Sequence, residues 1–460
     1  MKKMKRRFKK LVSILMVALM MCGILGGCGK GSEGDEQQGG TNNSESSGGV
    51  QELTFWVSWG TSEMKKLQVI ADDFNESQSD YHITLVSSGG IAEIRSKMGT
   101  TKQEYYPSLI CGGATTAATY ATSEYVAPLQ DFIDKDNEDW TTGLFDTVRS
   151  SYSDSEGNLL GHPIGVSCAG YAVNLDLLKA AGYSLSDVTS FEKIADIAKK
   201  AVSSDVCDYG VSFQSGVDLL DMLTIQGVDY VDKDNGWSGD ATKSLLLEGK
   251  TNAAVKKAMD IFASLYEEAA AYPYGSTGAD ATAFKGGKLL FWKTTNSTAF
   301  VNLGTTAGFE WAFIPSVGVD DNAEYKGHAL SEGTGVYICN TGNEREMQGA
   351  YEFVKFLVND ENQIYWATSI GYVGYSKQVV DEYRQWATEN YPSGNSIIDT
   401  LLGSPAELRL PYVVSDLLSA NSELFSAVSI DPKGDIDGYI QAASEKIDMG
   451  IQVYNMRKGK

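Results

Sequence analysis

The start of the folded chain places a helix between two strands within about 35 residues. Leu53–Ser58 is rich in aromatic and β-branched residues, which is typical of a strand, and a second strand is predicted at His82–Val86. The residues between them that recur at helical spacing are Met64, Leu67, Ile70, Ala71 and Phe74. Two strands joined through a helix can pair in parallel, so this segment indicates an α/β fold.

A third strand is predicted at Pro107–Cys111, and Val126–Ile133 closes the first group of elements. In open α/β sheets the loops after the carboxyl ends of the strands face the ligand crevice. The aromatic residues and glycines in or beside these loops are Trp56, Trp59, Gly89, Gly90, Gly112 and Gly113. The sequence therefore predicts a crevice near these loops.

The length of the chain favours more than one hydrophobic core. It has 460 residues, of which roughly 400 follow the N-terminal leader, more than a single core usually organises. We expect lobe one to comprise residues 52–163 and about 309–342, and lobe two to comprise about 164–308 and 343–455.

The N-terminus reads as an export signal. A basic start is followed by the apolar run Leu11–Met21, which is shorter than the roughly 20 residues that a membrane-spanning helix needs. Leu25–Cys28 resembles a bacterial lipobox, in which the cysteine is lipidated after cleavage. We therefore predict a signal peptide over residues 1–27 and lipidation at Cys28. The Gly- and Ser-rich residues from Cys28 to Val50 should form a flexible tether.

The charge of the chain excludes one class of partner. The net charge is −22, and removal of the seven basic residues of the leader brings it to about −29, which disfavours binding to nucleic acid. Two interpretations stay open for the four cysteines of the folded part, which are widely spaced: thiols without partners, or a disulfide in an exported protein. These residues are Cys111, Cys168, Cys207 and Cys339.

No catalytic or metal-binding motif stands out. His82, His162 and His328 form no zinc motif. The segments that begin at Asp134–Glu138 and Asp232–Gly236 resemble the start of a calcium loop, but both lack glycine at the sixth position and glutamate at the twelfth. No G-x-S-x-G motif is present, and no spacing singles out a pair of carboxylates for glycoside hydrolysis. We therefore expect binding without catalysis, with no metal and no cofactor.

The order of these features resembles a known family. After the lipobox and tether come the strand with Phe55-Trp-Val-Ser-Trp59, the Pro107-Ser-Leu-Ile110 strand, and the long motif from Gly161 to Gly182. Together they resemble the extracellular solute-binding proteins (family 1) of carbohydrate-type ABC importers. The resemblance implies a two-lobed α/β fold of the type II periplasmic-binding-protein kind, with a hinge and a ligand cleft between the lobes. Ser151–Leu160, Gly371–Gly374 and Glu407–Leu410 look most like the sn-glycerol-3-phosphate-binding branch.

Seven ligand-binding residues are predicted. Trp59, Trp292 and Tyr372 adjoin Gly-rich or Ser/Thr-rich loops, where a ring can stack on a sugar. The resemblance implies that the counterparts of the branch's ligand-binding residues are Ser167, Ser297, Gly333, Tyr372 and Arg409. Other positions of the branch's site depart from its pattern, at Ile91, about Ala114, Phe213 and Val217. The identity of the ligand and its charge are therefore left open.

These features predict a substrate-binding lipoprotein of an ABC importer, anchored to the membrane by lipid alone and facing outward. We expect a monomer that captures a sugar or glycerol-phosphate-type solute and delivers it to the permease and ATPase subunits, with no nucleic-acid partner. The alternative is a surface carbohydrate-active enzyme or adhesin that reuses the fold.

Overall fold

The computed structural model describes residues 49–136, 139–276, 278–304, 307–412 and 414–457, and the chain from Gln51 onward forms one unit. The signal peptide, Cys28 and nearly all of the tether lie outside the described residues. In the described part of the chain, no helix has both the length and the apolar character needed to cross a bilayer.

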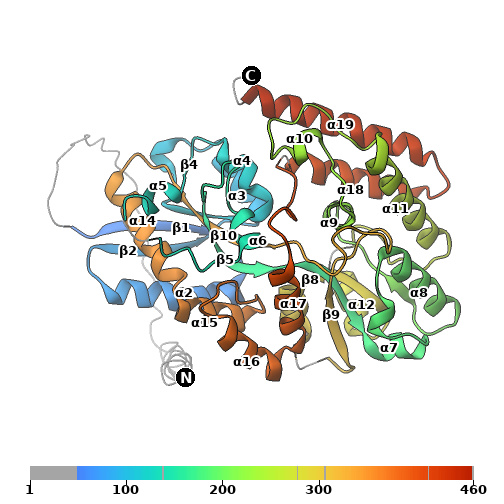
Figure 1. Ribbon diagram of the computed structural model, residues 1–460. Helices are drawn as coiled ribbons and strands as arrows, with labels where there is room; N and C mark the ends of the chain where they lie inside the picture. Colours follow the sequence, from blue (N-terminus) through green and yellow to red (C-terminus); the bar gives the residue numbers. More distant parts are fainter. Residues whose placement is uncertain (1–48, 137–138, 277, 305–306, 413, 458–460) are drawn as a thin grey trace, which may run out of the picture. The chain divides into compact units, whose positions relative to one another are not determined.

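The first sheet opens with the predicted helix-linked pair of parallel strands (Figure 1). Its strands follow the order β2-β1-β3-β10-β4, and β5 also pairs with β10. Strand β10 runs antiparallel to β3, β4 and β5, whereas β1 is parallel to β2 and β3. The strands are β1 (Gln51–Val57), β2 (Tyr81–Ser87), β3 (Leu109–Gly113), β4 (Val126–Ala127), β5 (His162–Ser167) and β10 (Glu332–Cys339).

The second sheet has the order β7-β8-β6-β9 in the described residues. Strand β6 is antiparallel to both β8 and β9, and β7 is parallel to β8. The strands are β6 (Ala169–Asn174), β7 (Tyr209–Val211), β8 (Leu289–Thr295) and β9 (Trp311–Pro315). Only Cys168 separates β5 from β6, so the chain passes from one sheet to the other through a single residue.

Helices flank both sheets (Figure 1). Those that follow strands of the first sheet, or pack with it, are α2 (Thr61–Ser77), α3 (Ile91–Met98), α4 (Ala117–Ala121), α5 (Gln130–Ile133), α6 (Asp146–Ser150), α14 (Glu344–Leu357) and α15 (Asp360–Ile370). The remaining helices are α7 (Leu175–Ala180), α8 (Phe191–Ser203), α9 (Val217–Gln226), α10 (Asp232–Asn235), α11 (Gly249–Glu267), α12 (Ala279–Lys285), α13 (Asn296–Leu303), α16 (Val380–Asn390), α17 (Pro392–Gly403), α18 (Val414–Ile430) and α19 (Ile436–Arg457).

Side chains that alternate along the strands divide the interior into two cores. Ala172 and Trp292 face a core that continues from the first sheet, whereas Tyr171 and Phe291 face a core shared with α8, α9, α11 and α18. This alternation follows from the two-residue period of a strand, which points successive side chains to opposite faces. Helices therefore cover the second sheet on both sides.

The chain returns to the first sheet later than the sequence predicted. We expected the return from about residue 309, but β9 pairs with β6 in the second sheet, and the first strand back in the first sheet is β10. A strand at 311–315 offers hydrogen-bonding edges that either sheet can use, and the tertiary pairing decides between them. The return to the first sheet therefore follows the crossing segment 316–331.

Helix α14 was assigned to lobe two, and the structure packs it on the first sheet instead. The ring of Phe353 lies edge-on to Phe55 of β1 and to Phe74 of α2, with centroid distances of 6.2 and 5.1 Å. The spacing of its apolar residues predicts a buried helical face but does not say which sheet buries it. Helix α15 also belongs here, since Trp366 lies 5.0 Å from Trp59 after β1.

Candidate functional site

The aromatic side chains Trp59 and Tyr372 meet beside the point where the chain passes between the sheets. The indole Nε1 of Trp59 donates to Tyr372 Oη at 3.4 Å, and Tyr372 Oη lies 3.4 Å from Thr334 Oγ1 of β10. Trp59 is only partly buried, whereas 7% of Tyr372 is exposed. Both hydrogen bonds are long, so these groups retain capacity to bond with another partner.

Two glycines allow Tyr372 to sit this close to the strands. A Cβ on Gly165 of β5 would lie 2.0 Å from the Tyr372 ring, so the ring rests directly on the backbone. Gly333 of β10 has a φ of +119°, and a Cβ there would lie 2.0 Å from the carbonyl oxygen of Gly165. Any other residue at either position would push β5, β10 and Tyr372 apart.

Ser167 and Ser297 lie at the ends of neighbouring elements. Ser167 is the last residue of β5, is 3% exposed, and pairs in register with Glu332 of β10. Ser297 lies in the first turn of α13, where its hydroxyl is 3.2 Å from the hydroxyl of Thr295, the residue that caps the helix. We call Trp59, Gly165, Ser167, Gly333, Thr334 and Tyr372 the junction cluster.

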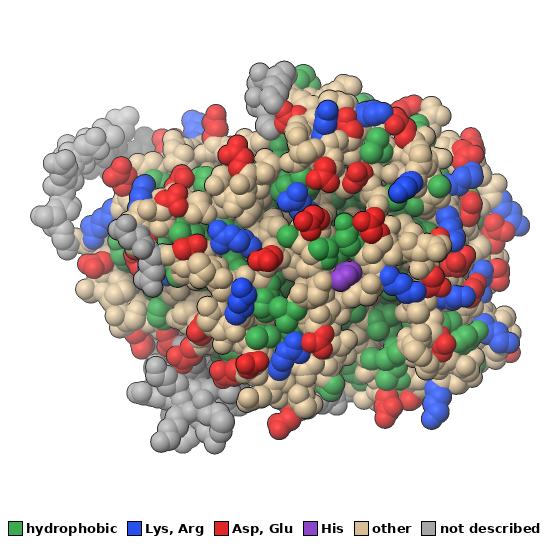
Figure 2. Space-filling view, viewed as in Figure 1, with side chains coloured by type: hydrophobic (Ala, Val, Ile, Leu, Met, Phe, Trp, Pro, Cys, Tyr) green, Lys and Arg blue, Asp and Glu red, His purple; other side chains and the backbone are tan. Residues whose placement is uncertain are grey.

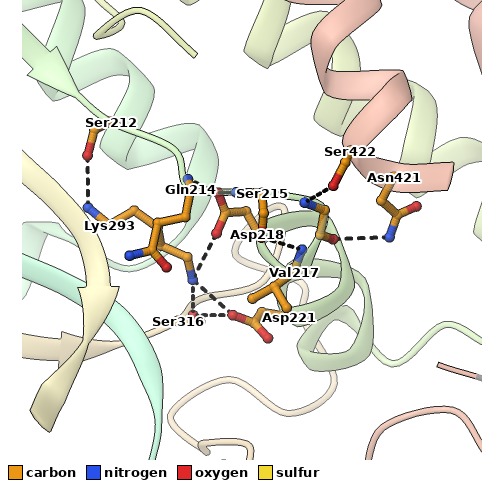
Figure 3. A network of polar contacts seen from close by, with 11 residues as sticks. Ser212, Gln214, Ser215, Val217, Asp218, Asp221, Lys293, Ser316, Asn421 and Ser422 are labelled. Carbon is orange, nitrogen blue, oxygen red and sulfur yellow. Dashed lines mark hydrogen bonds and ion pairs between the residues drawn. The ribbon is translucent and has the colours of Figure 1, made fainter. Parts of the chain in front are cut away.

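A second set of polar groups is buried inside lobe two (Figure 3). Lys293 of β8 donates to Asp221 Oδ2 at 2.9 Å and to Ser316 Oγ at 2.6 Å, and Asp218 Oδ1 lies 3.8 Å from its Nζ. The exposed fractions of the Lys293, Asp218 and Asp221 side chains are 1%, 0% and 1%. We call these three residues and Ser316 the ion cluster.

Backbone amides and hydroxyls complete the surroundings of the ion cluster. Asp218 Oδ2 accepts from the amides of Gln214 and Ser215, at 2.7 and 3.3 Å, and the amide of Lys293 donates to Ser212 Oγ. Figure 3 shows these groups converging from β8 and from the loop before α9. Carboxylates and an ammonium group that pair in this way hold the strand, the helix and the crossing segment together.

No metal centre is formed from these groups. Across residues 49–457, apart from the short gaps given above, no three His, Cys, Asp or Glu side chains are grouped in a way that could hold a metal ion. The four cysteines of the described part are free, and three of them are buried, so the thiol interpretation is the one that the structure supports. Figure 2 shows acidic and basic side chains interspersed over the face in view.

Residues 69–392 match the model of a protein family described as bacterial extracellular solute-binding protein. The match spans well over half of the chain. The protein belongs to this family. The prediction from the sequence is thereby confirmed at the level of the family.

Named relatives of this solute-binding protein are similar over most of its length. It is 23% identical over 371 residues to the sn-glycerol-3-phosphate-binding periplasmic protein UgpB of Yersinia pestis bv. Antiqua (strain Antiqua). The matched region covers 79% of this chain and 82% of the relative. The corresponding protein of Escherichia coli (strain K12) is 23% identical over 362 residues, covering 77% of this chain and 82% of the relative.

Solved structures share the fold. UgpB from Mycobacterium tuberculosis in complex with glycerophosphocholine superposes with a TM-score of 0.70 at 16% identity, covering 90% of this chain and all of that one. A cyclic α-maltosyl-1,6-maltose binding protein from Arthrobacter globiformis has a TM-score of 0.67 at 15% identity, covering 88% of this chain and all of that one. The predicted two-lobed, type II α/β fold is confirmed.

Three predicted ligand residues of the solute-binding protein lie outside the junction cluster, namely Ser297, Trp292 and Arg409. Trp292 is 2% exposed, its ring packs 5.7 Å from that of Phe284, and its Nε1 donates to Asp280 at 3.2 Å. A ring buried on this scale offers no face to a ligand, so we leave Trp292 out of the proposed site. The sequence placed it correctly on β8 but could not tell which face of the sheet it joins.

Arg409 has partners of its own. Its guanidinium lies 3.8 Å from the centroid of the Trp237 ring, and Nη2 is 3.9 Å from Asp234 Oδ2. These contacts are with lobe-two residues rather than with the junction cluster, and the side chain remains 27% exposed. Arg409 as a ligand residue stays a prediction.

Sequence reasoning missed the ion cluster, although signals for it exist. Asp218 and Asp221 stand three residues apart in a mostly apolar helix, and Lys293 follows four apolar residues of β8. Burial alone would lower the pKa of Lys293, but the negative charges of Asp221 and Asp218 outweigh burial and raise it. Burial raises the pKa of Asp218 to about 6 in spite of Lys293. Lys293 is therefore a fixed positive charge at neutral pH.

Glu332 links the two sets of groups. It pairs with Ser167 of the junction cluster through the backbone, and its carboxyl approaches Asp221 of the ion cluster. Burial, followed by the negative charge of Asp221, raises the pKa of Glu332 well above its ordinary value. A carboxyl in this position favours its neutral form.

Proposed function

We propose that this protein captures a carbohydrate or glycerol-phosphate-type solute outside the cell and delivers it to the permease of an ABC importer. The observation that carries the proposal is the junction cluster. It combines a partly exposed indole, a tyrosine hydroxyl and a threonine hydroxyl where the two sheets of a solute-binding protein meet. Rings that stack on sugar faces and hydroxyls that bond with polyols are the groups such a ligand needs.

The relatives support the choice of ligand classes. The UgpB relatives are named for sn-glycerol 3-phosphate, and of the two solved structures described above one contains glycerophosphocholine and the other is named for cyclic α-maltosyl-1,6-maltose. The junction cluster itself carries no formal charge, which favours recognition through hydroxyl groups. In this proposal the ligand binds Trp59, Ser167, Ser297, Gly333 and Tyr372.

The mechanism in this proposal is closure of the two lobes around the solute. Cys168 and the crossing segment 316–331 are the places where the chain passes between the sheets, so a change of angle there brings the lobes together. A ligand that contacts both lobes binds the closed form more tightly and shifts the population toward it. The permease then recognises the closed form.

A panel of ligands tests the function. Protein that begins at Gly29 is mixed with maltotriose, sn-glycerol 3-phosphate or glycerophosphocholine, and unfolding temperature, heat of binding and reaction products are measured. We expect stabilisation by at least one compound without turnover, and a smaller radius of gyration in solution scattering at saturation. Formation of product would instead favour the surface enzyme, and binding with an unchanged radius would contradict closure.

Matched variants locate the site. Trp59→Ala should weaken binding by about 2 kcal/mol, roughly 30-fold, because aromatic residues at the centre of a binding site carry much of the energy. Tyr105→Ala is the control, since Tyr105 is 69% exposed and lies in the short 3₁₀ helix Gln103–Tyr105, outside the junction cluster. Equal affinity of the two variants would remove Trp59 from the site.

We also propose that lipidation of Cys28 anchors the protein to the outer face of the cell membrane. The lipobox-like Leu25–Cys28 and the polar segment that follows support this anchor. Cys28→Ala should release the protein into the soluble fraction without changing ligand affinity. A variant that stays with membranes after a salt wash would require another anchor.

A further inference from the structure

Asn296 bonds to Cys168, the single residue between β5 of the first sheet and β6 of the second. It is the first residue of α13 and is fully buried. Its side-chain Oδ1 accepts from the backbone N–H of Cys168 at 2.8 Å, and the backbone N–H of Asn296 donates to the carbonyl oxygen of Cys168 at 3.2 Å. The two residues are therefore joined by a reciprocal pair of hydrogen bonds at the crossing between β5 and β6.

The other end of the same side chain bonds to the residue before Tyr372. Asn296 Nδ2 donates to the carbonyl oxygen of Gly371 at 2.9 Å. Gly371 ends α15 in a left-handed conformation, with a φ of +76°, and a Cβ there would lie 2.5 Å from the Phe300 side chain of α13. The start of α13 and the end of α15 thus fit closely, and the Asn296 amide fixes their separation.

These partners adjoin several proposed ligand residues. Cys168 follows Ser167, Gly371 precedes Tyr372, and Asn296 itself precedes Ser297. Tyr372 is held from its other side as well, because the amide of Val373 donates to the carbonyl oxygen of Val166 at 3.0 Å. One buried side-chain amide therefore contacts the neighbours of Ser167 and Tyr372, and it belongs to the residue that precedes Ser297.

We propose that Asn296 is a positioning residue that ties the crossing at Cys168 to Tyr372 and thereby sets the ligand affinity. The proposal rests on the function proposed above, and it adds a residue that does not touch the ligand. Any movement of the lobes about Cys168 must carry the Asn296 amide with it, or break a buried hydrogen bond. In either case Tyr372 and Ser297 respond to the angle between the lobes.

The chemistry of the position explains why asparagine fits. Cys168 requires an acceptor and Gly371 requires a donor, and a primary amide supplies both in one planar group. Alanine supplies neither and leaves two buried backbone groups without partners. Ionised aspartate keeps the acceptor but turns an oxygen toward the carbonyl of Gly371.

The first test measures ligand affinity. The probe is whichever of maltotriose, sn-glycerol 3-phosphate and glycerophosphocholine stabilises the wild-type protein most. We expect Asn296→Ala to weaken binding of this probe between about 3- and 30-fold. Asn174→Ala is the matched control, because Asn174 is also buried and its Oδ1 accepts a single amide, that of Leu177 at the start of α7. The control should lose stability but keep its affinity. Equal affinity of wild type and Asn296→Ala overturns the proposal.

The pH dependence of Asn296→Asp separates positioning from general loss of stability. A protonated carboxyl can donate to Gly371 while its other oxygen still accepts from Cys168, so acidification should restore the missing donor. We expect the affinity of Asn296→Asp to approach that of wild type between pH 7 and pH 5, while Asn296→Ala shows no such recovery. Parallel behaviour of the two variants contradicts a role for the donor.

Amide hydrogen exchange of the ligand-free protein gives a test that does not depend on ligand. In Asn296→Ala the peptides that contain Cys168 and Tyr372 should both exchange faster, although they are far apart in sequence. In Asn174→Ala both should keep their wild-type rates. Faster exchange at Cys168 alone overturns the coupling to Tyr372. Failure of every probe to bind the wild-type protein counts against the proposed function, and exchange then decides about Asn296 independently.

Discussion

The junction cluster and the ion cluster both contain polar side chains, yet they differ in the length of their contacts and in their exposure to solvent. In the ion cluster, contacts of 2.6 to 2.9 Å join Lys293, Asp221 and Ser316, and the charged side chains are at most 1% exposed. In the junction cluster, the Trp59–Tyr372 and Tyr372–Thr334 contacts are both 3.4 Å, and the indole is partly exposed.

This difference separates a structural role from a binding role. Buried charges cost free energy unless they are paired, and the Lys293 ammonium pairs with Asp221 and lies 3.8 Å from Asp218. Asp218 Oδ1 and Asp221 Oδ1 accept no hydrogen bond in the described structure, but the cluster is closed to solvent, so we assign it a structural role. Long hydrogen bonds between neutral groups cost little to replace, and a ligand hydroxyl can take them over. The buried charged contacts of the ion cluster are therefore not where we place the ligand.

The largest effect should come from breaking the ion cluster. Lys293→Met leaves two buried carboxylates without their cation, and we expect the free energy of unfolding to fall by about 3 to 5 kcal/mol, measured by urea denaturation. Lys288→Met is the control, because the Lys288–Asp208 pair is exposed and should matter by less than about 1 kcal/mol. A similar small loss in both variants would show that the ion cluster does not stabilise the fold.

Acidification should lower the stability of the protein through His162, a buried residue at the start of β5, the strand that also carries Gly165 and Ser167 of the junction cluster. Burial lowers the pKa of His162 from 6.5 to about 4. The folded state favours the neutral form of His162. Its contribution to the free energy of unfolding is therefore complete above pH 6.5 and is lost as the pH falls from there through 4. The loss should reach about 3 kcal/mol.

The test for His162 is the pH dependence of stability in two histidine variants. His162→Gln should be less stable than wild type at pH 7 and should lose less stability between pH 6.5 and pH 4. His82→Gln is the control, because the ring of His82 is exposed beside Glu52. A wild-type pH profile retained in His162→Gln would assign the acid sensitivity to other groups.

Arg409 sharpens the comparison by asking whether a charge helps the junction cluster. If the ligand is anionic and contacts Arg409, loss of a charge-assisted contact worth about 1.5 to 3 kcal/mol should weaken binding by about 10- to 150-fold in Arg409→Ala. Arg409→Lys should recover only part of this, because an ammonium group lacks the planar fork. For a neutral sugar, Trp59→Ala and Tyr372→Ala should have the larger effects.

Calorimetry with sn-glycerol 3-phosphate and maltotriose decides between these outcomes. An unchanged affinity of Arg409→Ala for a phosphorylated ligand would contradict the phosphate interpretation. The contacts of Arg409 with Trp237 and Asp234 would then be its whole role.

The smallest effect is expected for a single hydroxyl. Tyr372→Phe removes the group that joins Trp59 and Thr334, and affinity should fall by about 1 kcal/mol, roughly fivefold. Tyr383→Phe is the control, since Tyr383 is buried in α16 and its hydroxyl has no hydrogen-bond partner in the described structure. Equal affinities would mean that only the Tyr372 ring contributes.

Much of the fold followed from local patterns. The strand, helix and strand from Gln51 to Ser87 form as predicted, because apolar residues at a two-residue or 3.6-residue period already specify which face is buried. The assignment of β9 and α14 to lobes was wrong for the same reason that their existence was predictable. A periodic pattern defines a buried face but carries no information about the partner that buries it.

The candidate site divides in the same way. Their position beside glycine- or serine-rich loops singled out Trp59 and Tyr372, and the resemblance to the glycerol-phosphate-binding branch implied Ser167, Gly333 and Tyr372. Only the tertiary structure decided that these residues meet, that Trp292 is buried, and that Asn296 bonds to Cys168 and to Gly371. The physical reason is distance along the chain. Trp59 and Tyr372 are 313 residues apart, and contacts over such separations depend on how the two sheets pack, which no local pattern encodes.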